Sequence, residues 1–399
     1  MDSRPAFGVY IHIPYCLQRC TYCDFATYEQ SKIFGSSIYV DLVLEELSQR
    51  ADFYGPRFLD TIYFGGGTPS LLPAEEIVSL LKGLEKHGYR RSDKTEVTIE
   101  INPATVSQDK LSAYLDAGIN RFSVGAQTFD DGLLKMVHRE HNSRQTLETL
   151  DLLQKRDLNF SFDLLFALPT QTLDGVRRDL EIAIDRGSKH ISPYCLTVPS
   201  GHPLSKGRAP DEEQAEMFEL IRDALVSRGF SPYEISNFSL PGHESRHNLL
   251  YWTDEEYWGV GLSAHSYSKR EVWGTRFWNP SSIGDYRKLI EAHRGRRFQS
   301  PRQALSADLS EQLEMHQSLT DFCHTSLRLM RGLKEAELLA KFPSRLTSPV
   351  KTRLDRLVKR GLLQVIPDGW SLTREGVVLS NLVFSEMTFL KDELTASPR

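Results

Sequence analysis

Three of the chain's five cysteines fall within eight residues, as Cys16, Cys20 and Cys23. Cysteines separated in this way can all turn their sulfurs inward only if the backbone curls around a common centre, which is most simply a metal. Four thiolates would close a tetrahedral zinc site or saturate a four-iron cluster. Three thiolates leave one iron of a [4Fe–4S] cluster without a protein ligand, so this spacing favours a cluster that can bind a small molecule.

Two other uses of the three cysteines stay open at this point. Zinc could take His12 as a fourth ligand, but this side chain would have to reach back over Ile13 and Pro14. A disulfide would leave one of three crowded thiols alone. An odd cysteine count without a visible secretory signal also argues against a disulfide framework and is typical of a reducing compartment.

The cysteine loop, with the aromatic Tyr22 inside it, resembles the cluster loop of radical S-adenosylmethionine (SAM) proteins. The preceding stretch from Tyr10 to Pro14 narrows the resemblance to proteins similar to oxygen-independent coproporphyrinogen III oxidase, including a haem-chaperone branch. The resemblance implies that the amino and carboxylate groups of SAM bind the open iron. Cys16, Cys20 and Cys23 are therefore predicted to hold a [4Fe–4S] cluster.

Alternating strands and helices are expected to position this loop. Short runs rich in β-branched and aromatic residues recur between longer segments with helical spacing. We expect strands at the following ranges: 9–13, 61–64, 95–101, 121–124, 159–164 and 190–196. Such alternation predicts right-handed βαβ units and a parallel sheet. Periodicity alone leaves an eight-stranded barrel or an open sheet possible, and the resemblance implies a partial (β/α)6 barrel.

Ligand sites of parallel sheets gather at the carboxyl ends of the strands, and this sequence has suitable residues there. Three consecutive glycines, Gly65 to Gly67, precede Thr68 at the end of the second strand. Glycines let a backbone approach a ligand closely and offer its N–H groups to a carboxylate. A triple glycine can equally be a tight turn. Here Gly66, Gly67 and Thr68 resemble the motif that holds the methionine part of SAM.

Polar side chains also end the next three strands, as Glu100, Gln127 and Asp163. Taken singly they could be a surface residue, a loop cap and a turn partner. The resemblance implies that these residues surround SAM together with Arg139. A carboxylate can accept both ribose hydroxyls, and an arginine can pair with an acidic group. Tyr10 and Tyr22 are expected to line the same pocket.

A second informative stretch runs from Ser245 to Ser266 and is rich in histidine, glycine and aromatic residues. Such a mixture suits a flat, apolar, iron-bearing ligand, because imidazole is a common axial ligand of haem. A histidine beside polar and aromatic residues is more often a hydrogen-bonded core residue. The motif His-Asn-x-x-Tyr-Trp resembles one connected with haem binding in the chaperone branch. His247 is therefore the preferred haem ligand, and His265 is the second candidate.

Two departures from the oxidase pattern favour the chaperone branch. Phe25 stands where the oxidase loop has a fourth cysteine, and the oxidase has a longer N-terminal extension. The predicted function is a cluster- and SAM-binding haem chaperone of porphyrin metabolism that delivers haem to haem-requiring, respiratory enzymes. The alternative is oxidative decarboxylation of coproporphyrinogen III, so the sequence leaves open whether the protein is an enzyme. A third reading keeps the cluster as a structural or electron-transfer centre.

Composition and charge indicate which other partners the protein is expected to have. The 399 residues are 40% hydrophobic and 25% charged, with a net charge of −5. This balance is typical of a globular protein and provides no basic footprint for nucleic acid. No apolar run approaches the length of a membrane span, and we expect a cytoplasmic protein. Peripheral membrane association and a homodimer are both compatible with these features.

The pattern of predicted helices and strands divides the chain into three segments. Residues 1–235 are expected to form the barrel, residues 236–303 a connecting segment with the histidine motif, and residues 304–399 a smaller C-terminal domain. Helix, helix, hairpin and final helix predict a winged-helix-like module in this last segment. Its mixed charge favours packing or protein docking over DNA binding. The resemblance thus spans nearly the whole chain.

Overall fold

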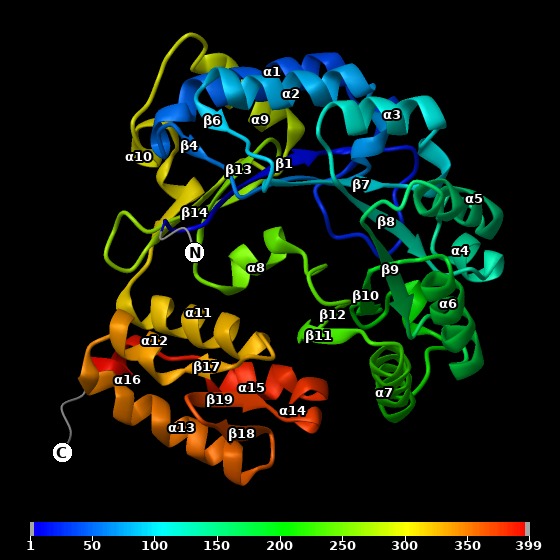
Figure 1. Cartoon of the computed structure of the whole chain (residues 1–399). Helices are drawn as coiled ribbons and strands as arrows, with labels where there is room; N and C mark the ends of the chain where they lie inside the picture. Colours follow the sequence, from blue (N-terminus) through cyan, green and yellow to red (C-terminus); the bar gives the residue numbers. More distant parts are fainter. Residues whose placement is uncertain (1–3, 396–399) are drawn as a thin grey trace.

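Parallel strands that alternate with helices form the main body of the computed structural model, which describes residues 4–395 (Figure 1). Each strand pairs with the next one along the chain, and together they curve into a partial barrel. These strands are β1 (Phe7–Ile13), β5 (Thr61–Gly66), β7 (Glu96–Ile101), β8 (Arg121–Gln127), β9 (Phe160–Phe166) and β10 (His190–Cys195). The predicted fold class is confirmed.

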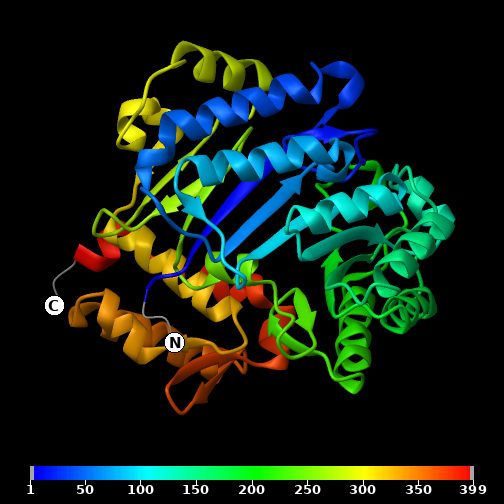
Figure 2. The same ribbon diagram turned by 45° about the horizontal axis from the view of Figure 1, so that its top comes forward.

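Helices cover the outer face of this sheet because alternate strand residues are apolar and point toward them. Val9, Ile11, Phe122 and Val124, for example, are completely buried. The covering helices are α1 (Ser36–Arg50), α2 (Ala74–Lys86), α3 (Gln108–Asp116), α4 (Asp131–Met136), α5 (Ser143–Gln154), α6 (Leu173–Asp185) and α7 (Asp211–Ser227). Figure 2 shows α1 and α2, in blue and cyan, lying across the strands.

The sheet continues beyond the expected strands at both edges. On one edge β13 (Glu256–Val260) adds in parallel to β1 and is followed by the antiparallel strands β14 (His265–Ser268), β15 (Thr275–Trp278) and β16 (Ser310–Gln312). On the other edge β12 (Asn237–Ser239) pairs antiparallel with β10, and β11 (Ser231–Glu234) pairs antiparallel with β12. The stretch that was expected to be a connecting segment therefore contributes strands to a 12-stranded sheet.

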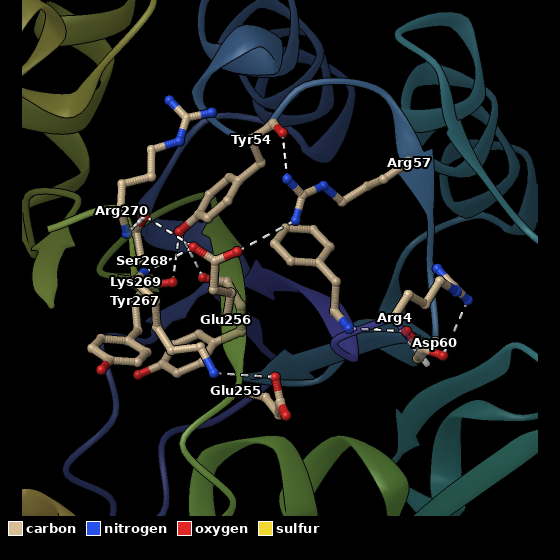
Figure 3. A network of polar contacts seen from close by, with 12 residues as sticks. Arg4, Tyr54, Arg57, Asp60, Glu255, Glu256, Tyr267, Ser268, Lys269 and Arg270 are labelled. Carbon is tan, nitrogen blue, oxygen red and sulfur yellow. Dashed lines mark hydrogen bonds and ion pairs between the residues drawn. The ribbon is translucent and has the colours of Figure 1, made fainter. Parts of the chain in front are cut away.

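A polar network holds β13 and β14 beside the start of β1 (Figure 3). The guanidinium of Arg57 lies 4.4 Å from the centre of the Phe7 ring and 3.5 Å from the Glu256 carboxylate. The Tyr54 hydroxyl, at 3.0 and 2.9 Å, donates to backbone carbonyls of β13 and β14. These contacts join residues that are about two hundred positions apart in the sequence.

A second apolar core lies in the C-terminal part of the chain and includes Leu319, Leu354 and Trp370. Its helices are α11 (Met315–Arg328), α12 (Glu335–Lys341), α13 (Thr347–Lys359), α14 (Arg374–Val378), α15 (Ser380–Glu386) and α16 (Lys391–Thr395). They pack with a small sheet of β17 (Leu333–Lys334), β18 (Leu363–Ile366) and β19 (Gly369–Leu372). None of the helices within residues 4–395 has the length and hydropathy of a membrane span.

The short helix α8 (Arg246–Trp252) lies between the barrel and α11 (Figure 1). At its start, the backbone N–H groups of Arg246 and His247 donate to the Glu96 carboxylate of β7, at 3.3 and 3.0 Å. At its end, the Arg328 guanidinium of α11 lies 4.4 Å from the centre of the Trp252 ring. The helix that contains the histidine motif therefore joins the barrel to the C-terminal part.

Candidate functional site

One cavity of about 570 Å³ occupies the interior of the barrel on the side of β7 to β10. Its walls are the inward-facing residues of these strands, which alternate with the buried apolar residues under the helices. The inward residues are Thr98 and Glu100, then Arg121, Ser123, Gly125 and Gln127, then Ser161 and Asp163, and finally His190, Ser192 and Tyr194. The predicted site at the carboxyl ends of the strands is thus the mouth of a deeper space.

The cysteine loop lies over this mouth. Cys16, Cys20 and Cys23 are free, half-buried thiols that all line the cavity. The loop closes at its base, where the Tyr28 backbone N–H donates to the Pro14 carbonyl at 2.7 Å and β2 (Tyr15–Cys16) pairs with β3 (Tyr28–Glu29). This closure makes the chain between the two strands curl, as the cysteine spacing predicts.

The surroundings of the thiols fit a cluster loop. The Arg139 guanidinium donates to the Cys20 sulfur at 3.5 Å and so places a positive charge beside a ligand that must be deprotonated. A Cβ added at Gly67 would lie 3.1 Å from the Cys16 sulfur and 2.6 Å from the Tyr15 carbonyl oxygen, so only glycine fits there. Within residues 4–395, no three His, Cys, Asp or Glu side chains are gathered around a single-ion centre.

The glycine motif differs from expectation in one respect. Gly66 has φ of 115°, a conformation that favours glycine, and its N–H donates to Glu100 at 3.1 Å. The N–H groups of Gly67 and Thr68 donate to the carbonyls of Ile13 and Tyr15, at 2.8 and 2.7 Å. The amides therefore hold the motif against the cysteine loop, and the idea that they stay free for a ligand carboxylate was wrong.

Glu100 of β7 and Asp163 of β9 both line the upper part of the cavity, with β8 between their strands. Glu100 accepts hydrogen bonds from the Tyr63 hydroxyl at 2.9 Å and from Gly66. Burial, together with the negative charge of Asp163, raises the pKa of Glu100 to about 7, although the hydrogen bonds from Tyr63 and Gly66 lower it. Burial likewise raises the pKa of Asp163 to about 6, although Ser123 donates to this carboxylate at 3.2 Å. Both carboxyls therefore change charge close to neutral pH.

Arg139, Gln127 and Tyr22 complete the wall beneath the cysteine loop. Arg139 donates through Nη2 to the Gly125 carbonyl, and its buried Nε has no hydrogen-bond partner among the described residues. Gln127 ends β8 with φ of 70°, and the Asp179 carboxylate of α6 holds the two residues after it. The structure thus brings together all predicted residues at this end except Tyr10.

Tyr10 requires a correction, because it is not among the residues that line the cavity. Its hydroxyl lies 3.1 Å from His12 Nδ1, and its ring stacks on that of Tyr63 with 6.1 Å between centres. Tyr63, which was not predicted, lines the cavity instead. Both tyrosines are inward positions of adjacent strands, and the strand pattern alone does not distinguish the residue nearer the cavity.

His247 lies beneath these aromatic rings and is 1% exposed. Its Nδ1 is 2.7 Å from the Thr61 hydroxyl and its Nε2 is 2.8 Å from the Tyr251 hydroxyl, so both nitrogens have partners. Burial lowers the pKa of His247 to about 3, which keeps the ring neutral. Axial ligation of haem would require one of these hydrogen bonds to break. His265, by contrast, is exposed and stacks on Trp278 at the start of β14.

Several residues of the cavity were missed by sequence reasoning, notably Arg121, His190 and Tyr194. The signal that could have found them is a period of two: apart from Gly125 and Leu165, the residues at every second position of β8, β9 and β10 are polar, and buried apolar residues lie between them. A parallel strand covered on both faces is usually apolar throughout. A polar residue at every second position therefore indicates a strand that faces a hydrophilic interior.

The chain is similar to proteins of known family along nearly its whole length. A model described as the radical SAM superfamily matches residues 10–183. The heme chaperone HemW of Bacillus subtilis is 34% identical over 94% of this chain and 98% of the relative. That of Escherichia coli is 30% identical over 96% of this chain and 98% of the relative.

The structure of coproporphyrinogen III oxidase (HemN) from Escherichia coli, a radical SAM enzyme, superposes with a TM-score of 0.80. At 19% identity it covers 96% of this chain and 90% of that chain, so this likeness shows the fold. The cysteine loop, the partial barrel and the HemW relatives agree with the resemblance found in the sequence. The chain belongs to the radical SAM superfamily and, within it, to the family of heme chaperone HemW proteins.

Proposed function

We propose that this protein binds a [4Fe–4S] cluster and SAM at the mouth of the barrel, and that it binds haem and transfers it to haem-requiring proteins in the cytoplasm. The observation that supports the first part is the convergence of three cysteines on a cavity that also contains Glu100 and Asp163. The second part is supported by the similarity to relatives that are heme chaperones.

In this proposal Cys16, Cys20 and Cys23 hold three irons, and Arg139 offsets the negative charge of the thiolates. When bound, the cluster and SAM supply one-electron and radical chemistry. Glu100 accepts ribose hydroxyls in its ionised form, while Tyr63 and Gly66 keep its carboxylate oriented. Gly66, Gly67, Thr68 and Gln127 shape the wall, and Tyr22 covers the site.

For haem itself the structure favours His265 over His247 as the axial ligand. His265 is exposed, and Trp278 provides an apolar surface beside it with 5.6 Å between ring centres. His247 is buried with both nitrogens engaged and would have to give up a hydrogen bond to bind iron. We therefore propose His265 as the first ligand candidate and retain His247 as the second.

The test is an anaerobic haem titration of the reconstituted full chain, followed by absorbance. We expect stoichiometric binding by the native protein and at least tenfold weaker binding by His265→Ala. A matched control is His87→Ala, because this histidine lies at the end of α2 on the outer side of the barrel. Weaker haem binding by His247→Ala, with unchanged binding by His265→Ala, would identify His247 as the ligand. Absence of haem binding by the native chain would contradict the chaperone proposal.

The alternative is that the protein is an enzyme that oxidises coproporphyrinogen III, as the structurally similar HemN does. It is tested in parallel by supplying coproporphyrinogen III and SAM under anaerobic, reducing conditions and looking for decarboxylated products. The proposal expects none. Steady formation of protoporphyrinogen without haem binding would make the protein an oxidase.

A further inference from the structure

The deep end of the cavity, opposite the cysteine loop, contains polar groups that the cluster and SAM do not use. Arg121 is the first residue of β8 and His190 the first of β10, so both lie at the end of the barrel far from the loop. Ser245, the N-cap residue of α8, and Asn248, within α8, line the same end of the cavity. We call the group of Thr98, Arg121, Ser161, His190, Ser245 and Asn248 the floor site.

One terminal nitrogen of the Arg121 guanidinium has a hydrogen-bond partner, and the other has none among the described residues. It is 2% exposed, and its Nη1 donates to the His243 carbonyl at 3.0 Å. Nη1 also lies 3.9 Å from the Glu96 carboxylate, too far for a hydrogen bond. Nη2 has no hydrogen-bond partner among the described residues. A buried guanidinium branch without a partner is costly, so this position is built for a group that can accept from it.

His190 presents a second free donor at the same place. The Tyr233 hydroxyl accepts the Ser245 backbone N–H at 3.4 Å and lies 2.8 Å from His190 Nε2. The Tyr233 hydroxyl can therefore donate its own proton to Nε2, and in that tautomer Nδ1 is the N–H of a neutral ring. Burial, aided by the positive charge of Arg121, lowers the pKa of His190 and so keeps it neutral. Nδ1 is buried and unpartnered within residues 4–395.

The third free group is the Thr98 hydroxyl, which is buried and also has no partner in the described part of the chain. In the parallel register Thr98 lies opposite Arg121, while Ser161 lies between Ser123 and His190. Three unpartnered groups that can donate thus converge on one end of the cavity. A planar anion with two oxygens satisfies the unpartnered branch of a guanidinium and two further donors.

We propose that the floor site binds the carboxylate of a ligand that enters the barrel from its open end. The path down to it is lined by the small hydroxyl residues Ser123 and Ser192, and Ser161 of the floor site lies between Ser123 and His190, where this path ends. The strand rise of about 3.3 Å per residue places Arg121 roughly 20 Å from Gln127, so the carboxylate is held well away from the cysteine loop. It belongs either to a free small acid or to a propionate side chain of haem, and the second source rests on the proposed function.

The first experiment titrates the full, cluster-reconstituted chain with sodium propionate labelled with 13C at its carboxyl carbon and follows the binding by NMR. We expect saturable binding by the native protein and at least tenfold weaker binding by Arg121→Gln. The matched control is Arg144→Gln, since Arg144 is an 85% exposed arginine on α5 and should leave binding unchanged. Equal affinity of native protein and Arg121→Gln for propionate would overturn a site for free acids.

The second experiment compares haem with haem dimethyl ester, which lacks free carboxylates. If propionate side chains reach the floor site, the native protein prefers haem several-fold and Arg121→Gln loses this preference. Haem binding without any preference shows that the haem carboxylates do not reach the floor site. Failure to bind haem at all contradicts the proposed function and leaves the propionate titration to decide the inference. No propionate binding together with no preference for haem overturns the inference.

Arg121→Gln could fail to fold, so circular dichroism accompanies each titration and Ser161→Val provides a second variant. Ser161 is 3% exposed and lies beside His190 in the sheet. Valine has the β-branched shape that a strand accepts and narrows the path next to His190. We expect Ser161→Val to weaken propionate binding at least fivefold while Arg121 is intact. Unchanged binding by a folded Ser161→Val would contradict the proposed path.

Discussion

The two halves of the barrel interior follow the same strand pattern and are nevertheless filled in opposite ways. On β1 and β5 the inward residues include Tyr10, His12 and Tyr63, and His247 and Tyr251 pack beneath them in a continuous aromatic group. On β7 to β10 the corresponding positions are mostly polar, four of them are the small hydroxyl residues Thr98, Ser123, Ser161 and Ser192, and a cavity of about 570 Å³ lies between these strands. Side-chain size at alternate positions decides which half supports the fold and which half receives ligands.

We call the β7 to β10 side of the barrel, which contains the cavity, the open half, and the β1 and β5 side the filled half. The largest effect of a substitution should occur where the cysteine loop meets the open half. We expect Cys20→Ala to abolish bound iron and sulfide and the associated absorbance, because two thiolates and a vacant position do not hold a [4Fe–4S] cluster. The comparison is Cys195→Ala, an exposed cysteine outside the loop. Iron content equal to that of Cys195→Ala would remove the loop from the cofactor site.

Substitutions in the filled half should mainly lower the free energy of unfolding. Tyr63→Ala removes a ring that stacks on Tyr10 and His247 and a hydrogen bond to Glu100. We expect a loss of about 2–4 kcal/mol in the free energy of unfolding, measured by urea denaturation. Tyr63→Phe keeps the ring and should cost about 1 kcal/mol. Equal losses for both variants would show that the hydroxyl and not the packing matters.

Binding in the open half should depend on charge. Glu100→Gln preserves shape but removes the negative charge, and we expect SAM affinity to fall at least tenfold, about 1.4 kcal/mol, by equilibrium dialysis. Tyr10→Phe, in the filled half, should change SAM affinity less than twofold. A larger effect of Tyr10→Phe would mean that the boundary between the halves lies elsewhere.

A smaller effect follows from pH. Because the pKa of Glu100 is raised to about 7, the carboxyl is largely protonated at pH 6 and largely ionised at pH 8. Only the ionised form accepts two hydroxyl protons, so SAM affinity should rise a few-fold between these pH values. Glu100→Gln should show no such rise. The same rise in this variant would assign it to another group.

The smallest effect is expected for a serine of the open half. Ser161→Ala removes one hydrogen bond, from Ser161 to Ser123 at 2.9 Å, without emptying packed volume. The free energy of unfolding should change by at most about 1 kcal/mol. A loss as large as that of Tyr63→Ala would show that the open half also supports the fold.

Sequence reasoning predicted the parallel strands because each is a short β-rich run, and it predicted the cysteine loop because three thiols at that spacing need a common centre. It missed the addition of β13 to β1, since a pairing between Phe7 and Glu256 leaves no local signal. Its prediction that the histidine motif supplies a haem ligand stays a prediction. The pattern around His247 is the same for a ligand and for a buried ring, and only the partners Thr61 and Tyr251 distinguish the two.

The pairing of β1 with β13 also has a consequence during synthesis. The first strand of the sheet cannot gain its second neighbour until residue 260 has left the ribosome, and until then one of its edges is open. An open edge of Val9, Ile11 and Ile13 is a template for pairing with other chains. A chain that stops before β13 should therefore aggregate, although it contains every residue of the cysteine loop. A strand that is made late protects the first one made.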